Sequence, residues 1–220
     1  MKQMKEIAEL TAKNLLKVRA VKLNNENPFT WASGRKSPIY CDNRVTLSYP
    51  EIRTFIRQSF VDVLTERFGD VDVIAGVATG GIAQGALVAQ ELGKPFVYVR
   101  SEEKKHGLTN QIEGEIKSGQ SVVVIEDLVS TGKSSLIAVR ALRERGCKVK
   151  GMAAIFTYGL AVATENFANE DVELVTLTNY DTLLKVAIDE DYVSQADQNS
   201  LSMWRENPEK WSEDHINATH

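Results

Sequence analysis

Two acidic residues stand side by side at the end of an apolar run in the stretch VVVIEDLVSTGKSS, residues 122–135. They are Glu126 and Asp127, and small hydroxyl residues, a glycine and a lysine follow them. Adjacent carboxylates can accept hydrogen bonds from two neighbouring hydroxyls, as a ribose presents them. Successive backbone N–H groups at a helix start, with a glycine that lets the backbone approach closely, bind a phosphate. The stretch therefore describes a site for a ribose 5-phosphate.

The GKSS end of this stretch is not a P-loop. A Walker A motif needs a glycine five positions before its second glycine, and Asp127 occupies that position. The structural alternative is an acid pair that ends a strand and caps the following helix. If the stretch binds a phosphate instead, we expect the residues after the acids to bind it: Leu128, Val129, Ser130, Thr131, Gly132, Lys133 and Ser134.

A second glycine-containing turn, ATGG, lies between an apolar run and a helical segment. Its residues are Ala78, Thr79, Gly80 and Gly81. Such a turn can wrap an anion with its backbone N–H groups, and it is equally typical of a tight connection from strand to helix. Both interpretations can hold at once, so the turn is a candidate for a second anion.

A cationic segment opens the long connection that runs from Tyr98 to Glu115. It contains Arg100, Lys104, Lys105 and His106, followed by polar residues and glycines. A solvated run of charge is the simple interpretation. A connection of this length between two strands is usually functional or disordered, and its cations favour a lid over a polyanion.

The composition limits the class of protein. With 220 residues and 43% hydrophobic content, the chain can bury one substantial core. The net charge of −4 and the scattered cations disfavour nucleic-acid binding. Cys41 and Cys147 are far apart, which suggests neither a disulfide framework nor a zinc site. Without a signal peptide or an apolar run of membrane-spanning length, we expect a soluble, cytoplasmic protein.

Short Val- and Ile-rich runs alternate with helical segments of about ten residues, which is typical of an α/β fold with a central parallel sheet flanked by helices. Ligands of such sheets bind beyond the carboxyl ends of the strands. We expect one domain over residues 1–220, with a small hood formed mainly by 1–45 and a core over about 50–190. The strands are expected to begin at Val71, Pro95, Ser121, Lys148 and Asp171. The tail after Asp189 should be a closing helix that docks through Trp204 and Trp211.

Four apolar residues, two acids, two apolar residues and a Ser/Thr-Gly loop resemble the phosphoribosyl diphosphate signature of the type I phosphoribosyltransferases. The cationic segment, Arg-x3-Lys-x-His-Gly, resembles the mobile loop of the orotate members. FTWASGRKSPIYCDNR, residues 29–44, is similar to their hood, in which Ser-Gly-Arg-x-Ser-Pro-x-Tyr recurs. The hood residues implicated by the resemblance are Ser33, Gly34, Arg35, Tyr40 and Arg44.

The resemblance implies transfer of the 5-phosphoribosyl group from phosphoribosyl diphosphate to orotate, with Mg²⁺. It implies that the turn at 78–81 holds the diphosphate and that Arg100, Lys104 and His106 close over it. It also implies a homodimer with shared active sites. The alternatives are transfer to another base, or a non-catalytic nucleotide-binding regulator on the same fold.

The chain departs from the family pattern on the orotate side. Ala32 stands where a lysine is frequent, and Ser101 replaces a second lysine after the loop arginine. Many members also carry an arginine after the strand that corresponds to residues 151–156, where this chain reads FTYGL. The orotate carboxylate is then left to backbone amides, Arg44 or Lys133.

Overall fold

The computed structural model describes residues 2–31, 33–100, 111–195 and 197–217. Its centre is a six-stranded sheet in the order β10-β9-β8-β5-β6-β7. All neighbouring strands run parallel except the β6–β7 edge pair. The strands are β5 (Val73–Val77), β6 (Phe96–Val99), β7 (Ile112–Glu113), β8 (Ser121–Val129), β9 (Lys148–Thr157) and β10 (Leu174–Asn179). The predicted parallel sheet is therefore confirmed.

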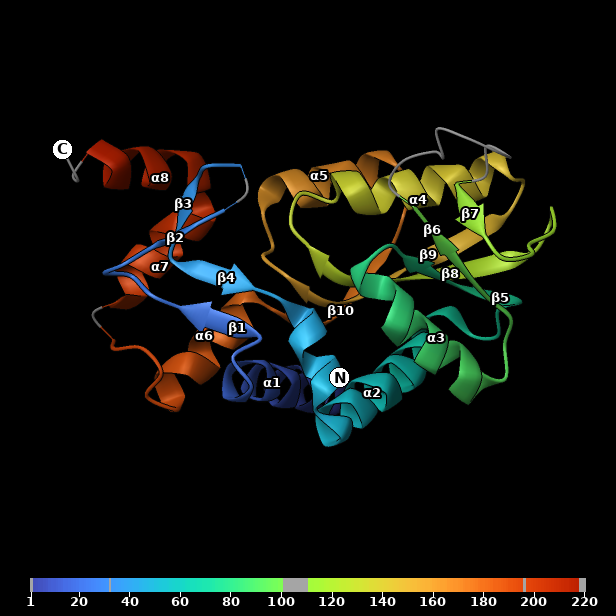
Figure 1. The fold of residues 1–220 in the computed structure, drawn as a ribbon, viewed down its shortest axis with the longest axis horizontal. Coiled ribbons are helices and arrows are strands. Elements are labelled where there is room, and N and C mark those ends of the chain that lie inside the picture. The colour runs from blue at the N-terminus through green and yellow to red at the C-terminus, as the bar shows by residue number, and fades with distance from the viewer. Residues whose placement is uncertain (1, 32, 101–110, 196, 218–220) are drawn as a thin grey trace.

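Helices cover both faces of this sheet, as Figure 1 shows. One face carries α1 (Lys2–Lys17), α2 (Pro50–Phe68), α3 (Gly80–Leu92) and α6 (Tyr180–Asp189), and the other carries α4 (Lys133–Glu144) and α5 (Ala161–Asn169). Side chains alternate between the faces along a strand, so Val123 and Ile125 of β8 enter one core while Val122 and Val124 enter the other. Burial on both faces explains why these strands are continuously apolar.

The hood lies beside the sheet, at the left of Figure 1. It contains the antiparallel pairs β1 (Val21–Leu23) with β4 (Ile39–Cys41) and β2 (Phe29–Thr30) with β3 (Lys36–Ser37). The short helix η1 (Asn43–Ser48) connects it to α2. Although the expected hood began at residue 1, α1 packs on β10 and α6, and so it belongs to the sheet layers.

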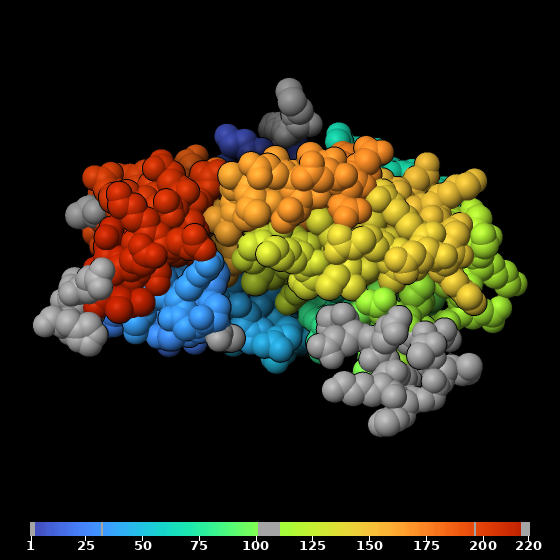
Figure 2. Space-filling model, turned by 90° about the horizontal axis from the view of Figure 1, so that it is seen from above, coloured from blue at the N-terminus to red at the C-terminus, as the bar shows by residue number. Residues whose placement is uncertain are grey.

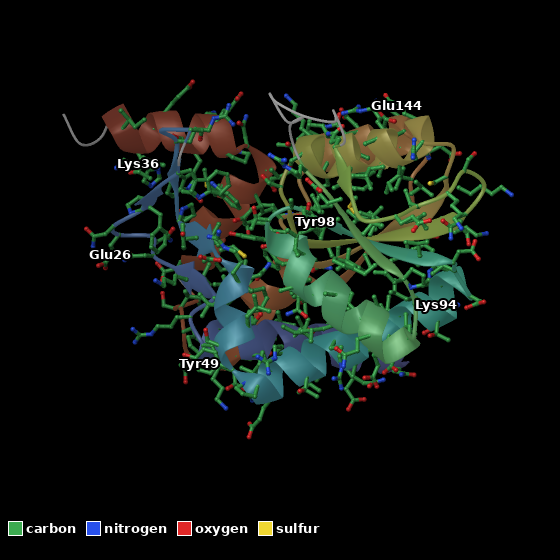
Figure 3. All side chains as sticks on the ribbon, turned by 45° about the vertical axis from the view of Figure 1, so that its right-hand side comes forward. Glu26, Lys36, Tyr49, Lys94, Tyr98 and Glu144 are labelled. Atoms are coloured by element: carbon green, nitrogen blue, oxygen red, sulfur yellow. The ribbon has the colours of Figure 1, made fainter. Side chains whose placement is uncertain are left out.

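The tail after Asp189 forms two helices, α7 (Asp197–Glu206) and α8 (Pro208–Asn217), where the sequence predicted one. Pro208 lacks a backbone N–H and is suited to the first turn of a helix, so α7 ends before it and α8 begins at it. The docking through tryptophans is confirmed, because Trp204 and Trp211 are 1% and 4% exposed. Helix α8 packs on the hood strand β3, and Figure 3 shows the labelled Lys36 beside it.

Trp204 joins the hood to the sheet. Its ring centroid lies 5.8 Å from that of Trp31 in the hood and 5.5 Å from that of Tyr158, just after β9. It also lies 5.4 Å from Tyr180, whose hydroxyl donates to the Leu201 carbonyl at 3.0 Å. Aromatic rings in such edge and tilted arrangements gain energy beyond their burial. This cluster therefore fixes α7 between the hood and the end of β9.

Within the described part of the chain, no helix combines the length and the apolar character that a bilayer crossing requires. Both cysteines, Cys41 and Cys147, are free thiols.

Candidate active site

The predicted anion sites come together at one edge of the sheet, because parallel strands end at the same edge. The 78–81 turn follows β5, and the 126–134 stretch lies at the end of its neighbour β8. A Cβ atom added to Gly80 would lie 2.2 Å from the Asp127 carboxylate, so these two segments touch. Figure 3 marks the two ends of β6, with Lys94 before its start and Tyr98 near the site edge.

Side chains from neighbouring elements bind the backbone carbonyls of the loop that follows the acid pair. The Thr157 hydroxyl donates to the Val129 carbonyl at 3.1 Å, and Asn166 of α5 donates to the Thr131 carbonyl at 2.9 Å. No side chain caps α4, which begins at Lys133 with Gly132 as its N-cap. Among the described residues, the N–H groups of 131–133 make no hydrogen bond. They are available to an anion at the positive end of the helix.

Gly132 is required here for a reason that the sequence did not indicate. Its φ is +78°, in the left-handed region that favours glycine. A Cβ atom would lie 2.6 Å from the ring of Phe167, on α5. The missing side chain therefore makes room for packing against α5 and permits the turn, whereas the sequence motif predicted that it permits close approach by an anion.

The two acids differ in environment. Glu126 is 5% exposed, and its two carboxyl oxygens accept from the Ser135 hydroxyl at 2.9 Å and the Asp127 N–H at 3.0 Å. Burial, and then the nearby Asp127 carboxylate, raises the pKa of Glu126 well above its ordinary value. Asp127 is only half-buried and faces Gly80 across the site. Asp127 is therefore the more accessible of the two acids, and Glu126 holds its backbone N–H.

The raised pKa of Glu126 predicts how stability depends on pH. A carboxyl whose pKa is higher in the folded protein opposes folding once pH exceeds its unfolded value, here 4.5, and the cost grows until pH passes the folded pKa. Glu126→Gln imitates the protonated acid and has no charge to lose. Its free energy of unfolding, relative to that of wild type, should therefore increase as pH rises from 5 to 8. Urea unfolding at several pH values measures this difference.

The exposed Glu165→Gln on α5 controls for the loss of one negative charge. A stability difference between Glu126→Gln and wild type that is the same at pH 5 and pH 8 would contradict the assignment.

Hood residues reach the site through η1. The buried Asn43 donates from its amide to the Asp127 carbonyl at 2.6 Å, which ties the hood to the acid pair. Arg44 makes two hydrogen bonds to Asp42, at 2.7 and 2.9 Å, and these lower the pKa of that carboxyl. The exposed Tyr40 ring lies 5.8 Å from that of Phe29.

The Ser-Gly-Arg segment forms the exposed turn between β2 and β3. Gly34 has a φ of +82°, and the Ser33 side chain is exposed. Arg35 pairs with Glu209 of α8. The structure therefore places these three residues at the rim of the hood, with Arg35 alone of the three lining the cleft described next.

A cleft of about 420 Å³ separates this rim from the loop at 130–133. Its walls come from the loop at 130–133, the segment after β9 at 160–162, the hood, and the α7–α8 junction. Figure 2 shows the red C-terminal helices against the orange segment of α5, with the blue hood beside them. Three cations line the cleft: Arg35, Lys133 and Arg205.

Arg100 begins the cationic segment at the end of β6. Its N–H donates to the Gln111 carbonyl at 2.9 Å, and its guanidinium lies 3.6 Å from the Glu113 carboxylate. The predicted lid residues Lys104 and His106 lie outside the described residues.

Several residues at the site were not singled out from the sequence. Asn43 lies inside the quoted hood stretch and carries the polar amide that could have identified it. Thr157, Asn166 and Arg205 lie in segments without a motif, and only the fold brings them to the 130–134 loop and the cleft.

Comparison with known proteins places these features in a family. Residues 47–178 match the phosphoribosyl transferase domain. The orotate phosphoribosyltransferase of Bacteroides thetaiotaomicron is 57% identical over 208 residues, 94% of this chain and 98% of the relative. The crystal structure of the Aeropyrum pernix orotate phosphoribosyltransferase superimposes with a TM-score of 0.72 at 32% identity, over 83% of this chain and 99% of that one.

A further solved structure is the Mycobacterium tuberculosis orotate phosphoribosyltransferase in complex with 5-phospho-α-D-ribosyl 1-diphosphate. It matches with a TM-score of 0.61 at 25% identity, over 79% of this chain and 98% of that one.

Proposed function

The chain belongs to the phosphoribosyltransferase family, among its orotate phosphoribosyltransferases, and we propose that its sheet-edge site works as follows. The reaction takes orotate and phosphoribosyl diphosphate to orotidine 5′-monophosphate and diphosphate, a step of pyrimidine biosynthesis. The observation that carries the assignment of the site is the contact of Gly80 with the Asp127 carboxylate. It supports the assignment because the 78–81 turn, the acid pair and the 130–134 loop then follow one another in the order in which the substrate carries its diphosphate, ribose and 5-phosphate.

Breaking the bond at the anomeric carbon leaves positive charge on the ribose and negative charge on the departing diphosphate. The protein therefore has to stabilise charge rather than supply a nucleophile. Asp127 accepts hydrogen bonds from the ribose hydroxyls and so orients the sugar. Its own backbone is held by Glu126, which accepts from its N–H, and by Asn43, which donates to its carbonyl. The N–H groups of 130–134 hold the 5-phosphate, and those of 78–81 receive the diphosphate.

The segment beginning at Arg100 closes over the diphosphate, with Lys104 and His106 as its other cations. Cations over this group offset the charge that it gains as it leaves, and closure excludes the water that would hydrolyse the activated sugar. Arg100 starts this segment from the end of β6, beside the 78–81 turn.

Mg²⁺ is the proposed cofactor, and the donor set fits one held mainly by substrate and water. Among the described residues no group of three or more His, Cys, Asp or Glu side chains could hold a metal. Mg²⁺ keeps several waters and often takes only one or two carboxylates in addition to substrate phosphates. Asp127 would act on the ion indirectly, because it would hold the ribose hydroxyls that lie beside it. When bound, the ion supplies positive charge to the diphosphate and ribose oxygens.

We further propose a cytoplasmic homodimer in which each subunit's cationic segment closes over the partner's site. The free thiols of Cys41 and Cys147 suit a reducing compartment.

Asp127→Asn tests the role of the ribose acid. The amide keeps the shape and loses the charge, which should remove about 1.5–3 kcal/mol of transition-state stabilisation, so kcat/KM for phosphoribosyl diphosphate should fall about 10- to 150-fold. Steady-state kinetics measure it, with the exposed Asp189→Asn on α6 as a matched control. An unchanged kcat/KM in folded Asp127→Asn would remove Asp127 from the mechanism.

The reaction itself is tested by incubating the protein with phosphoribosyl diphosphate, Mg²⁺ and one base at a time, and measuring diphosphate release. We expect release with orotate and none above background with uracil, adenine or hypoxanthine. Equal turnover of a purine base would overturn the choice of orotate.

A further inference from the structure

The order of strands indicates where the base must sit. In a displacement at an anomeric carbon that inverts it, the incoming group and the leaving group occupy opposite faces of the sugar. The diphosphate turn follows β5 and the ribose acids end β8, and the strand on the other side of β8 is β9. A base that enters on the side of the ribose acids away from the diphosphate turn would meet the end of β9, residues 157–160, beside Trp31 of the hood.

The cleft of about 420 Å³ lies at this place. It contains Trp31 from the hood and Leu160 after β9, which offer apolar surface to a flat ring. Thr131 of the 130–134 loop also lines the cleft. A base attached to a ribose 5-phosphate held at 130–134 would enter this cleft.

Orotate differs from uracil by one carboxylate, which needs a cation or N–H donors when it leaves water. Arg205 of α7 is placed to supply them. Its guanidinium nitrogens lie 3.5 and 3.6 Å from the Cβ position of Gly159, so it lies against the backbone just after β9. One nitrogen donates to the Asp181 carboxylate at 2.6 Å. A guanidinium has five N–H groups, so a fork remains for a second carboxylate.

The preceding residue holds Arg205 in place. Trp204 is fully packed among Trp31, Tyr158 and Tyr180, so the backbone that carries Arg205 is fixed relative to the end of β9. A cation on a packed helix loses less freedom on binding than one on an exposed turn.

The other cations near the cleft are less well placed. Arg44 already uses its fork in two hydrogen bonds to Asp42. Arg35 lies on the exposed hairpin turn and pairs with the exposed Glu209. Lys133 is exposed at the start of α4, next to the 5-phosphate loop.

We propose that Arg205, from the C-terminal helix α7, binds the carboxylate of orotate and so selects orotate over uracil. This inference rests on the proposed function and adds a specificity-determining residue from a part of the chain that carries no motif of the family. It also gives the C-terminal helices a role in the site.

Two nucleotides isolate the contact. Orotidine 5′-monophosphate and uridine 5′-monophosphate differ only in the carboxylate, so calorimetry with both separates its binding from that of ribose, phosphate and ring. In Arg205→Ala, we expect the Kd for orotidine 5′-monophosphate to rise by about 10- to 100-fold and that for uridine 5′-monophosphate to change less than about twofold. Arg205→Lys should fall between, because lysine keeps the charge without the fork.

The controls separate positioning from structure. Asp181→Asn removes the partner of Arg205 and should keep the preference for orotidine 5′-monophosphate. Arg140→Ala, on the exposed face of α4, removes a cation that pairs with Glu170 far from the cleft, and should change neither Kd.

Three results would overturn the proposal. They are equal losses for both nucleotides in Arg205→Ala, no loss for either, or a loss selective for orotidine 5′-monophosphate in Arg35→Ala or Lys133→Ala instead. Failure of the wild-type protein to bind orotidine 5′-monophosphate would be a different result, because it would overturn the proposed function on which this inference rests.

Discussion

Gly132→Val should reduce the affinity for phosphoribosyl diphosphate and for ribose 5-phosphate by on the order of 100-fold or more. A β-branched residue is strained at the φ of +78° that Gly132 adopts. Its Cβ atom would also lie 2.6 Å from the Phe167 ring. The loop at 130–134 must therefore shift, and its backbone N–H groups would no longer point together at the 5-phosphate. Isothermal calorimetry with both ligands measures the effect.

Gly119→Val is a matched control. Gly119 also has a positive φ, of +88°, but a Cβ atom there would meet nothing within 4 Å, and it lies before β8, at the opposite end of the strand from the loop. We expect this variant to lose stability and to keep its affinity for ribose 5-phosphate. Folded Gly132→Val with wild-type affinity would show that the loop does not bind the phosphate.

Mixing two impaired variants should raise activity if the subunits share their sites. In a mixed dimer of Lys104→Ala and Asp127→Asn, one site combines an intact core with the intact segment of the partner, and the other site collects both defects. Random reassociation makes roughly half of the dimers mixed, so activity should rise from a few per cent to about a quarter of wild type. Diphosphate release after dissociation and reassociation measures it.

The same variants reassociated separately provide the baseline, and a mass shift between tagged subunits verifies exchange. If each segment served its own subunit, every site in the mixture would keep one defect. Activity equal to the mean of the two baselines, with exchange verified, would then rule out shared sites.

The sheet and its edge were predictable because their signals are local. The strand at β8 reads as a continuous apolar run, since both of its faces are buried, and its acids and loop follow directly in the chain. The position of Asp127 beside Gly80 follows from the pairing of β5 with β8, an order of strands that was not predicted from the sequence. Sequence patterns of this kind specify what lies at a strand end.

The rest depended on contacts between distant segments. The packing of Trp31 with Trp204, and of Gly132 against Phe167, has no pattern in either segment alone. The different environments of Glu126 and Asp127 were also hidden, because two adjacent acids at a strand end look alike until the fold buries one. The boundary between α7 and α8 at Pro208 could have been predicted, since proline favours a helix start, but a single helix was predicted from the sequence.

The Trp31–Trp204 contact also sets an order of events during synthesis. The hood strands leave the ribosome before α7, which follows on the order of 10 s or more later at ~5–20 residues per second. The sheet can fold in the meantime, but the aromatic face of the hood has no cover until α7 emerges. Emergence of α7 is therefore the event that completes the hood side of the cleft, and a nascent chain stalled before residue 197 would carry a formed 130–134 loop and an unassembled hood.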